Sequence, residues 1–366
     1  MLSLRAVLLG SFWVSTCMAW PSDALAQNRA PSRQLAKLRL NGQTIEAAPL
    51  LEGSDGVLML GRDGAIFQIS LEVAGQSQLT TGRFTPASRS ALRNQLQQEF
   101  GNAYDVTATS HYLVVHPNGN GSQWSERFEE LYRSFGHYFK LRGFEVREPE
   151  FPLIAIVLPS RTEFERYAKS KGDKIPNDAL GYYSPMSNRV ALYDVSGGTN
   201  QQAWQENATT IIHEATHQTA FNTGIHQRLF PTPNWIVEGL GTMFEAEGVW
   251  NARYNTRSSD RVNADRLDQF KQYLGRRKKD AFVQLLAGDR MFRDDPHGAY
   301  AESWAWCYYL METRPRQFAS YLRKIAARGE LAQYSPTERL KDFTAEFGSN
   351  LDYLDAQFVR HMKSVK

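Results

Sequence analysis

The sequence of 366 residues contains only two cysteines, Cys17 and Cys307. Cys17 lies in an N-terminal segment that we expect to be removed, which leaves Cys307 alone in the mature chain. An internal disulfide is then excluded. The mature chain of about 340 residues must be stabilised by a hydrophobic core, and a chain of this length can bury one.

Excess charge of one sign is lacking too, since 42 Lys and Arg residues face 39 Asp and Glu residues and leave a formal net charge of +3. The densest basic run, RRKK at residues 276–279, is followed at once by Asp280, which is typical of a solvated helix end. Basic and aromatic residues are not interleaved, so the sequence predicts no nucleic-acid partner. No repeat period is present, and nothing in the sequence indicates the oligomeric state.

Long hydrophobic runs are scarce, and the one at the N-terminus is too short and too early for a membrane span. Arg5 precedes an apolar run over residues 6–20, as in a signal peptide. Ala24-Leu25-Ala26 fits the small-x-small rule for cleavage after Ala26. Residues 14–17 (VSTC) form a poor lipobox, so we expect no lipidation. We therefore predict an exported protein, periplasmic or secreted, with no membrane span after removal of residues 1–26.

The next segments differ in composition. Residues 27–36 are polar and predict a linker, whereas residues 37–85 alternate short apolar runs with turns such as Asn41-Gly42. This alternation predicts a small β-rich module. Substrate docking, wall attachment and simple packing remain open as its role.

The rest of the sequence predicts an α+β fold. Residues 88–260 mix expected helices with short apolar strands, and residues 261–366 are mostly helical. The expected elements of the first part are helices at 88–101, 123–141 and 201–221, strands at 111–116 and 151–158, a helix after a Ser160–Glu163 capping box, and a hairpin at 181–183 and 189–193. Those of the second part are helices at 264–274, from Tyr300 onward, and at 316–327, 336–347 and 351–362.

The most informative motif is His213-Glu214-Ala215-Thr216-His217. It lies in the expected helix at 201–221, which contains no Gly or Pro. On a helix, positions i and i+4 lie about 40° apart, so the two imidazoles project from one face and can share one metal ion. Glu214 falls beside them, where a carboxylate can take a proton from a metal-activated water.

A second expected helix, with Thr232-Pro233 as cap and first-turn proline, runs to about residue 247. Glu238 lies one turn into it and can supply a third ligand, which leaves the open position that catalytic zinc needs. Gly239 and Gly241 each cost roughly 1 kcal/mol against alanine in a helix. Close approach to the histidine-bearing helix would explain them.

Two polar residues share the helical face of Glu238, namely Thr242 and Glu245. Either can orient a ligand imidazole through its second ring nitrogen. We favour Glu245, and a solvent-facing carboxylate is the alternative.

The HExxH motif followed by WIVEG at residues 235–239 resembles the gluzincin superfamily of zinc metallopeptidases. More narrowly, the chain resembles a bacterial family of secreted gluzincin-like proteins (DUF1570-like). The resemblance implies one zinc ion per chain, with His213, His217 and Glu238 as metal ligands and Glu214 as general base. It also implies a gluzincin-like catalytic domain with a small sheet, active-site helices and a helical C-terminal part. It is best over residues 151–310 and poor over the first hundred.

Gluzincins also use a tyrosine or histidine to stabilise the oxyanion. Tyr300 has a placement similar to the catalytic tyrosine of aminopeptidase-like members, and His297 is a weaker candidate. A tyrosine that merely packs at a helix start is the alternative. The resemblance further implies that the strand Arg189–Tyr193 is an edge that pairs with a peptide or protein substrate.

Rival metal sites are less well supported. A metzincin needs Gly and His three and six residues after His217, where this chain has Ala220 and Thr223. His226 is a possible third ligand, but it lies in a polar connection without a helical partner face.

The sequence thus predicts an exported zinc metallopeptidase. Two alternatives stay open: a catalytically inactive gluzincin-like binding protein at the cell surface, and a zinc amidase that acts on a non-protein amide. The physiological substrate and the choice between endo- and exopeptidase action are not indicated.

Overall fold

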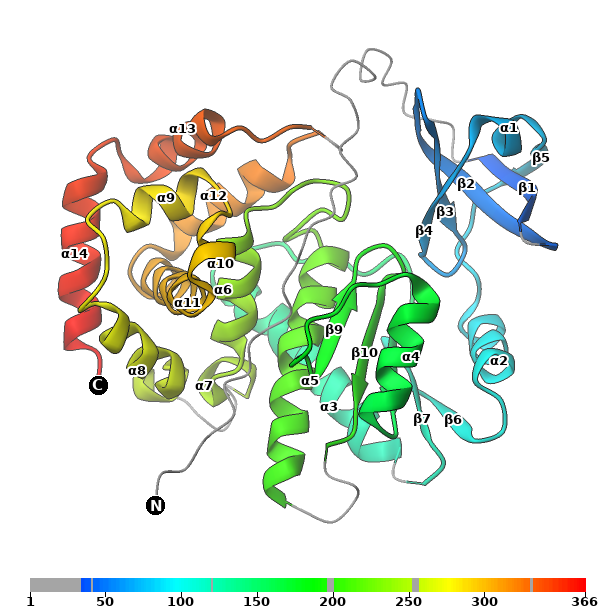
Figure 1. The fold of residues 1–366 in the computed structure, drawn as a ribbon, viewed down its shortest axis with the longest axis horizontal. Coiled ribbons are helices and arrows are strands. Elements are labelled where there is room, and N and C mark those ends of the chain that lie inside the picture. The colour runs from blue at the N-terminus through cyan, green and yellow to red at the C-terminus, as the bar shows by residue number, and fades with distance from the viewer. Residues whose placement is uncertain (1–33, 41, 120, 196–200, 252–256, 330–331) are drawn as a thin grey trace.

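The structure is a computed structural model that describes residues 34–366 except 41, 120, 196–200, 252–256 and 330–331 (Figure 1). The predicted signal peptide and the predicted linker up to residue 33 lie outside the described residues. Among the described residues, no helix combines the length and apolar character needed to cross a membrane.

The N-terminal part is a five-stranded antiparallel sheet in the order β4-β3-β2-β1-β5. Its elements are β1 (Gln34–Leu40), β2 (Gln43–Gly53), β3 (Gly56–Gly61), β4 (Ile66–Ile69), α1 (Leu71–Gly75) and β5 (Gln78–Arg83). The expected linker at 27–36 extends too far, because β1 starts at Gln34 and buries Ala36 between β2 and β5. Strand β3 is buried throughout, since its alternate side chains enter two separate apolar clusters.

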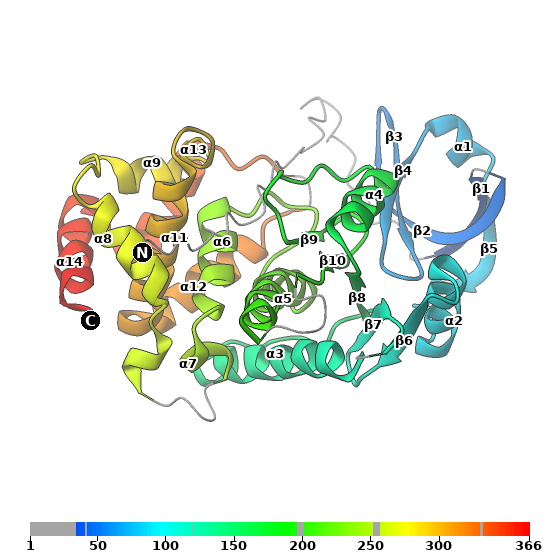
Figure 2. The same ribbon diagram turned by 60° about the horizontal axis from the view of Figure 1, so that its bottom comes forward.

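The second sheet lies beside this module and has the order β6-β7-β8-β10-β9 (Figure 2). Its strands are β6 (Tyr104–Ala108), β7 (Tyr112–Pro117), β8 (Leu153–Leu158), β9 (Gly181–Ser184) and β10 (Arg189–Tyr193). The central strands β7, β8 and β10 are parallel, and the two outer pairs are antiparallel.

Helices cover both faces of this sheet, which explains why β8 is apolar and buried at every position. One face packs on α3 (Gly121–Leu141) and α5 (Gln201–Asn222). The other packs on α2 (Arg89–Phe100) and α4 (Arg161–Lys171). Ser160, the first residue of the predicted capping box, and Ser88 both accept backbone hydrogen bonds at the starts of their helices.

The prediction that Arg189–Tyr193 forms a free edge is wrong. This strand, β10, pairs with β8 on one side and with β9 on the other, so both backbone edges are occupied. Strand β9 takes the outer position and lies against α5, where a Cβ at Gly181 would lie 2.8 Å from Thr210 Cγ2.

The C-terminal part is helical, as predicted, and is built around one buried helix, α11 (Pro296–Thr313). In Figure 1, α6, α8, α9, α12 and α14 lie around it, which explains why residues 298–311 are all buried. The surrounding helices are α6 (Asn234–Phe244), α7 (Glu247–Trp250), α8 (Ala264–Tyr273), α9 (Ala281–Ala287), α10 (Met291–Asp294), α12 (Pro315–Ala326), α13 (Pro336–Phe347) and α14 (Leu351–Ser364), and a 3₁₀ turn, η2 (Ser258–Arg261), precedes α8. The short helices α9 and α10 were not predicted.

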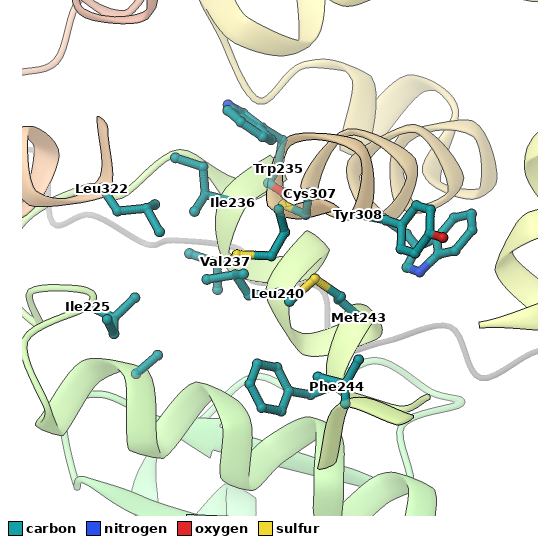
Figure 3. Close-up of a cluster of buried hydrophobic side chains, with 14 of the residues drawn as sticks. Ile225, Trp235, Ile236, Val237, Leu240, Met243, Phe244, Cys307, Tyr308 and Leu322 are labelled. Carbon is teal, nitrogen blue, oxygen red and sulfur yellow. Dashed lines mark hydrogen bonds between the residues drawn. The ribbon is translucent and has the colours of Figure 1, made fainter. Parts of the chain in front are cut away.

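Helix α6 differs from the prediction at both ends. Pro233, predicted as the first helical residue, is instead the N-cap residue, and its side chain makes no capping hydrogen bond. The helix ends at Phe244, three residues before the predicted end at about 247. Residues 235–244 are all buried, because α6 lies between α5 and α11 (Figure 3). Glu238 is therefore an acidic residue on a helix with no solvent-facing side.

The two glycines of α6 permit this close packing, but they serve different neighbours. A Cβ at Gly241 would lie 2.9 Å from the Cε1 atoms of both His213 and His217, as expected for approach to α5. A Cβ at Gly239 would lie 2.5 Å from the Ser303 carbonyl oxygen, so this glycine permits the close approach of α11.

A pair of glycine substitutions tests this packing. Gly239→Ala is expected to destabilise the zinc-free protein by about 2 kcal/mol or more, because the methyl group meets the backbone of α11. Gly136→Ala is the matched control, since no atom lies within 4 Å of a Cβ placed there in α3, and it should stabilise by about 0.5–1 kcal/mol. Urea unfolding measures both, and equal effects would contradict the packing argument.

Candidate metal centre

Three buried side chains converge where α5 meets α6. The Nε2 atoms of His213 and His217 lie 3.0 Å apart, as their spacing on one helix predicts. The Glu238 Oε2 atom lies 3.4 Å from the first nitrogen and 3.7 Å from the second. The structure therefore brings together the three residues that the sequence predicts as ligands, as a group that could hold a metal ion.

The spacing of these donors fits a zinc ion. Bonds of about 2.0–2.1 Å to a tetrahedral zinc place neighbouring donor atoms roughly 3.3 Å apart. Both oxygens of Glu238 are buried and have no hydrogen-bond partner of ordinary geometry among the described residues. A buried carboxylate is costly unless a charge compensates it, and a divalent cation between the three side chains would do so.

Glu245 fixes the orientation of His213, as predicted. It follows α6 directly, and its Oε1 accepts a hydrogen bond from the His213 Nδ1 at 2.8 Å, which leaves Nε2 to face the other donors. Burial alone would raise the pKa of Glu245, but the charges of Arg266 and His213 outweigh burial and lower this pKa. Thr242 does not share this role, because its hydroxyl donates to the Glu238 carbonyl oxygen at 2.7 Å.

The two imidazoles have opposite protonation preferences. Burial disfavours the charged form of His213, but the carboxylates of Glu238 and Glu245 outweigh burial and raise the pKa of His213 to about 10. Burial and the charge on His213 hold the pKa of His217 well below its usual range. The site is thus built to receive positive charge, and a metal ion would compete with the proton on His213.

Glu214 and Tyr300 border the same region. Glu214 is buried on α5 next to His213, and Tyr300 is buried one turn into α11. Burial raises the pKa of Tyr300 well above its usual range, and the charges of Glu238 and Glu214 raise it further. Tyr300 therefore lies within electrostatic reach of both carboxylates and keeps its hydroxyl proton.

The two other candidate histidines lie elsewhere. His297 is exposed in the first turn of α11. His226 is buried against Phe221, with a ring-centroid distance of 5.0 Å, and does not belong to the group of donor atoms. Burial lowers the pKa of His226 to about 3, so its ring is neutral.

Sequence reasoning missed two residues that support the site, Asn263 and Arg266. Both come from the start of α8 and contact Glu245, Asn263 through a hydrogen bond of 2.8 Å and Arg266 at 3.9 Å. Asn263 and Arg266 lie on a different helix from Glu245 and far from it along the chain, so no periodic pattern in the sequence indicates their contacts with Glu245.

Comparison with known proteins gives two findings. Residues 207–332 match the profile of a family described as "Protein of unknown function (DUF1570)". Among solved structures, the chain is similar to a mutant form of the M1 zinc metallopeptidase from Deinococcus radiodurans, with 14% identity and a TM-score of 0.40. The similarity covers 71% of this chain and 50% of that one, so the chain spans about half the length of that enzyme. No curated protein matches the sequence.

Metal content distinguishes the two possible third ligands. Glu238→Ala is expected to weaken zinc binding by more than about 100-fold. This exceeds the loss of about 10–100-fold that is typical when a residue that only hydrogen-bonds to a ligand is removed. His226→Ala removes the rival ligand and should leave zinc binding unchanged. Elemental analysis after dialysis against a chelator measures zinc per chain, and loss of zinc from His226→Ala would refute the assignment of Glu238.

Proposed function

We propose that this protein is a zinc-dependent metallopeptidase. The observation that carries the proposal is the buried triangle of two imidazole nitrogens and one carboxylate oxygen, with Glu214 next to it. Three protein donors and a neighbouring carboxylate that is not one of them are the components of a hydrolytic zinc site.

A zinc ion held by His213, His217 and Glu238 would polarise a carbonyl group and lower the pKa of a water molecule at the site. Glu214 would act as the general base and accept a proton from a water molecule as the water oxygen attacks the carbonyl carbon. When the carbon–nitrogen bond breaks, Glu214 returns the proton to the leaving amine. Water is thereby split between the two products.

Tyr300 is the proposed oxyanion stabiliser. Its hydroxyl stays protonated over the physiological pH range because burial and the nearby carboxylates oppose ionisation. A neutral hydroxyl donates a hydrogen bond to the carbonyl oxygen as negative charge develops there. The buried surroundings strengthen this interaction, because little water competes for the donor.

The proposed substrate is a peptide or protein that adds a strand to the second sheet. Strand β10 is paired on both sides, so we assign this role to the outer strand β9, which lies along α5. We also propose export through removal of residues 1–26, a proposal that rests on the sequence of that segment.

The first test separates metal binding from catalysis. Glu214→Gln is expected to keep one zinc ion per chain and to reduce cleavage of a mixed peptide library by about 100–10,000-fold. The glutamine side-chain amide cannot accept the proton of the attacking water. Mass spectrometry of the library and elemental analysis give the two readouts. Stoichiometric zinc in a wild-type protein that cleaves no peptide would redirect the assignment to a non-protein amide or a binding role.

The second test concerns Tyr300. Tyr300→Phe removes only the hydroxyl and should lower kcat by about 100–1,000-fold, with little change in KM and in zinc content. Tyr308→Phe, on the same helix, is the matched control and should retain activity. A Tyr300→Phe protein with wild-type kcat would leave this tyrosine as a packing residue.

A further inference from the structure

The first turn of α8 forms a support behind the ligand His213. Asn263 caps this helix by accepting a hydrogen bond from the Arg266 backbone N–H at 3.2 Å. The Asn263 side-chain amide also donates to Glu245 Oε2 at 2.8 Å and to the Thr242 carbonyl oxygen at 2.9 Å. The start of α8 is thereby bonded to the end of α6, where Glu245 lies.

Arg266 brings a buried positive charge to the same place. Its side chain is 6% exposed, and its Nε lies 3.9 Å from Glu245 Oε2. The guanidinium carbon lies 5.6 Å from the centre of the Tyr300 ring, and Nη1 donates to Gln269 Oε1 at 3.0 Å. One cation therefore lies between the carboxylate that orients His213 and the tyrosine on α11.

We propose that Arg266 is a positioning residue for the metal centre, which holds Glu245 in the orientation in which it accepts the hydrogen bond from His213. This inference rests on the proposed zinc site and extends it to α8. The two carboxylate oxygens of Glu245 have different partners. Oε1 accepts a hydrogen bond from His213, whereas Oε2 accepts one from Asn263 and lies near Arg266. The carboxylate is held on both sides, and its rotation away from the imidazole is opposed.

The charge of Arg266 is what separates this role from simple packing. Asn263 alone can bond Oε2, but an amide carries no net charge to compensate a carboxylate that is largely buried. Without Arg266, we expect the Glu245 carboxylate to turn toward water, because hydration would then stabilise its charge better than the protein does. The His213 ring would lose the hydrogen-bond partner that fixes its Nε2 toward Glu238 and His217. Loss of a residue that orients a metal ligand typically weakens metal binding by about 10–100-fold.

The experiment measures zinc affinity by competition with a chelator and the thermal midpoint of the zinc-free protein, in three variants. Arg266→Met should weaken zinc binding by about tenfold or more, whereas Arg266→Lys, which keeps the charge, should stay within about threefold of wild type. Arg261→Met is the matched control, because Arg261 pairs with Glu312 at 2.7 Å on the neighbouring 3₁₀ turn. It should shift the thermal midpoint but leave zinc affinity within twofold of wild type.

Unchanged zinc affinity in Arg266→Met would overturn the inference and leave Arg266 a purely structural residue. Equal losses in Arg266→Met and Arg266→Lys would overturn it as well, because charge would not be the property that matters. If Arg266→Met does not fold, Arg266→Gln replaces it with the same expected loss. Zinc binding by wild type without hydrolysis would overturn the peptidase function alone, and absence of zinc binding would overturn both.

Discussion

The contact between α5 and α6 at Gly241 is the constraint on which the candidate metal centre depends. Glycine allows the two helices to approach until both histidine rings lie against the α6 backbone, and one turn earlier Glu238 meets the same two rings. Any side chain at Gly241 would separate the helices and open the triangle of donor atoms. The geometry of the site is therefore set by backbone packing between the two helices.

The surrounding core explains how the fold tolerates such an arrangement. Residues 210–221 of α5 are almost entirely buried between the sheet and α6, and α6 is buried in turn against α11. Apolar side chains of α6, such as Leu240, Met243 and Phe244, belong to the large apolar core that surrounds this helix (Figure 3). This packing offsets the cost of a buried carboxylate, and it holds the donors to the sub-ångström precision that a metal site needs.

Local patterns in the sequence were enough to find the residues at the centre of the site. The i and i+4 spacing puts His213 and His217 on one face whatever the tertiary fold, and the seven-residue spacing from Glu238 to Glu245 indicates in the same way that Glu245 lies near them. The order of strands is a different kind of property. Nothing in residues 189–193 records that β8 and β9 occupy both sides of β10, because that order depends on how crossover connections return to the sheet. The role of Asn263 was hidden for the same reason, since α8 meets α6 only through tertiary packing.

The number of protein donors bears on which class of zinc site these residues would form. A structural zinc is closed by four protein ligands, whereas a catalytic zinc keeps a position for water and substrate. Among the described residues the group contains three donors, and the rival candidate His226 packs against Phe221 and is not one of them. The buried carboxylate of Glu214 next to this group is costly and would have no purpose in a closed site. Three donors and an adjacent carboxylate together favour the proposed site that activates water over one that only stabilises the fold.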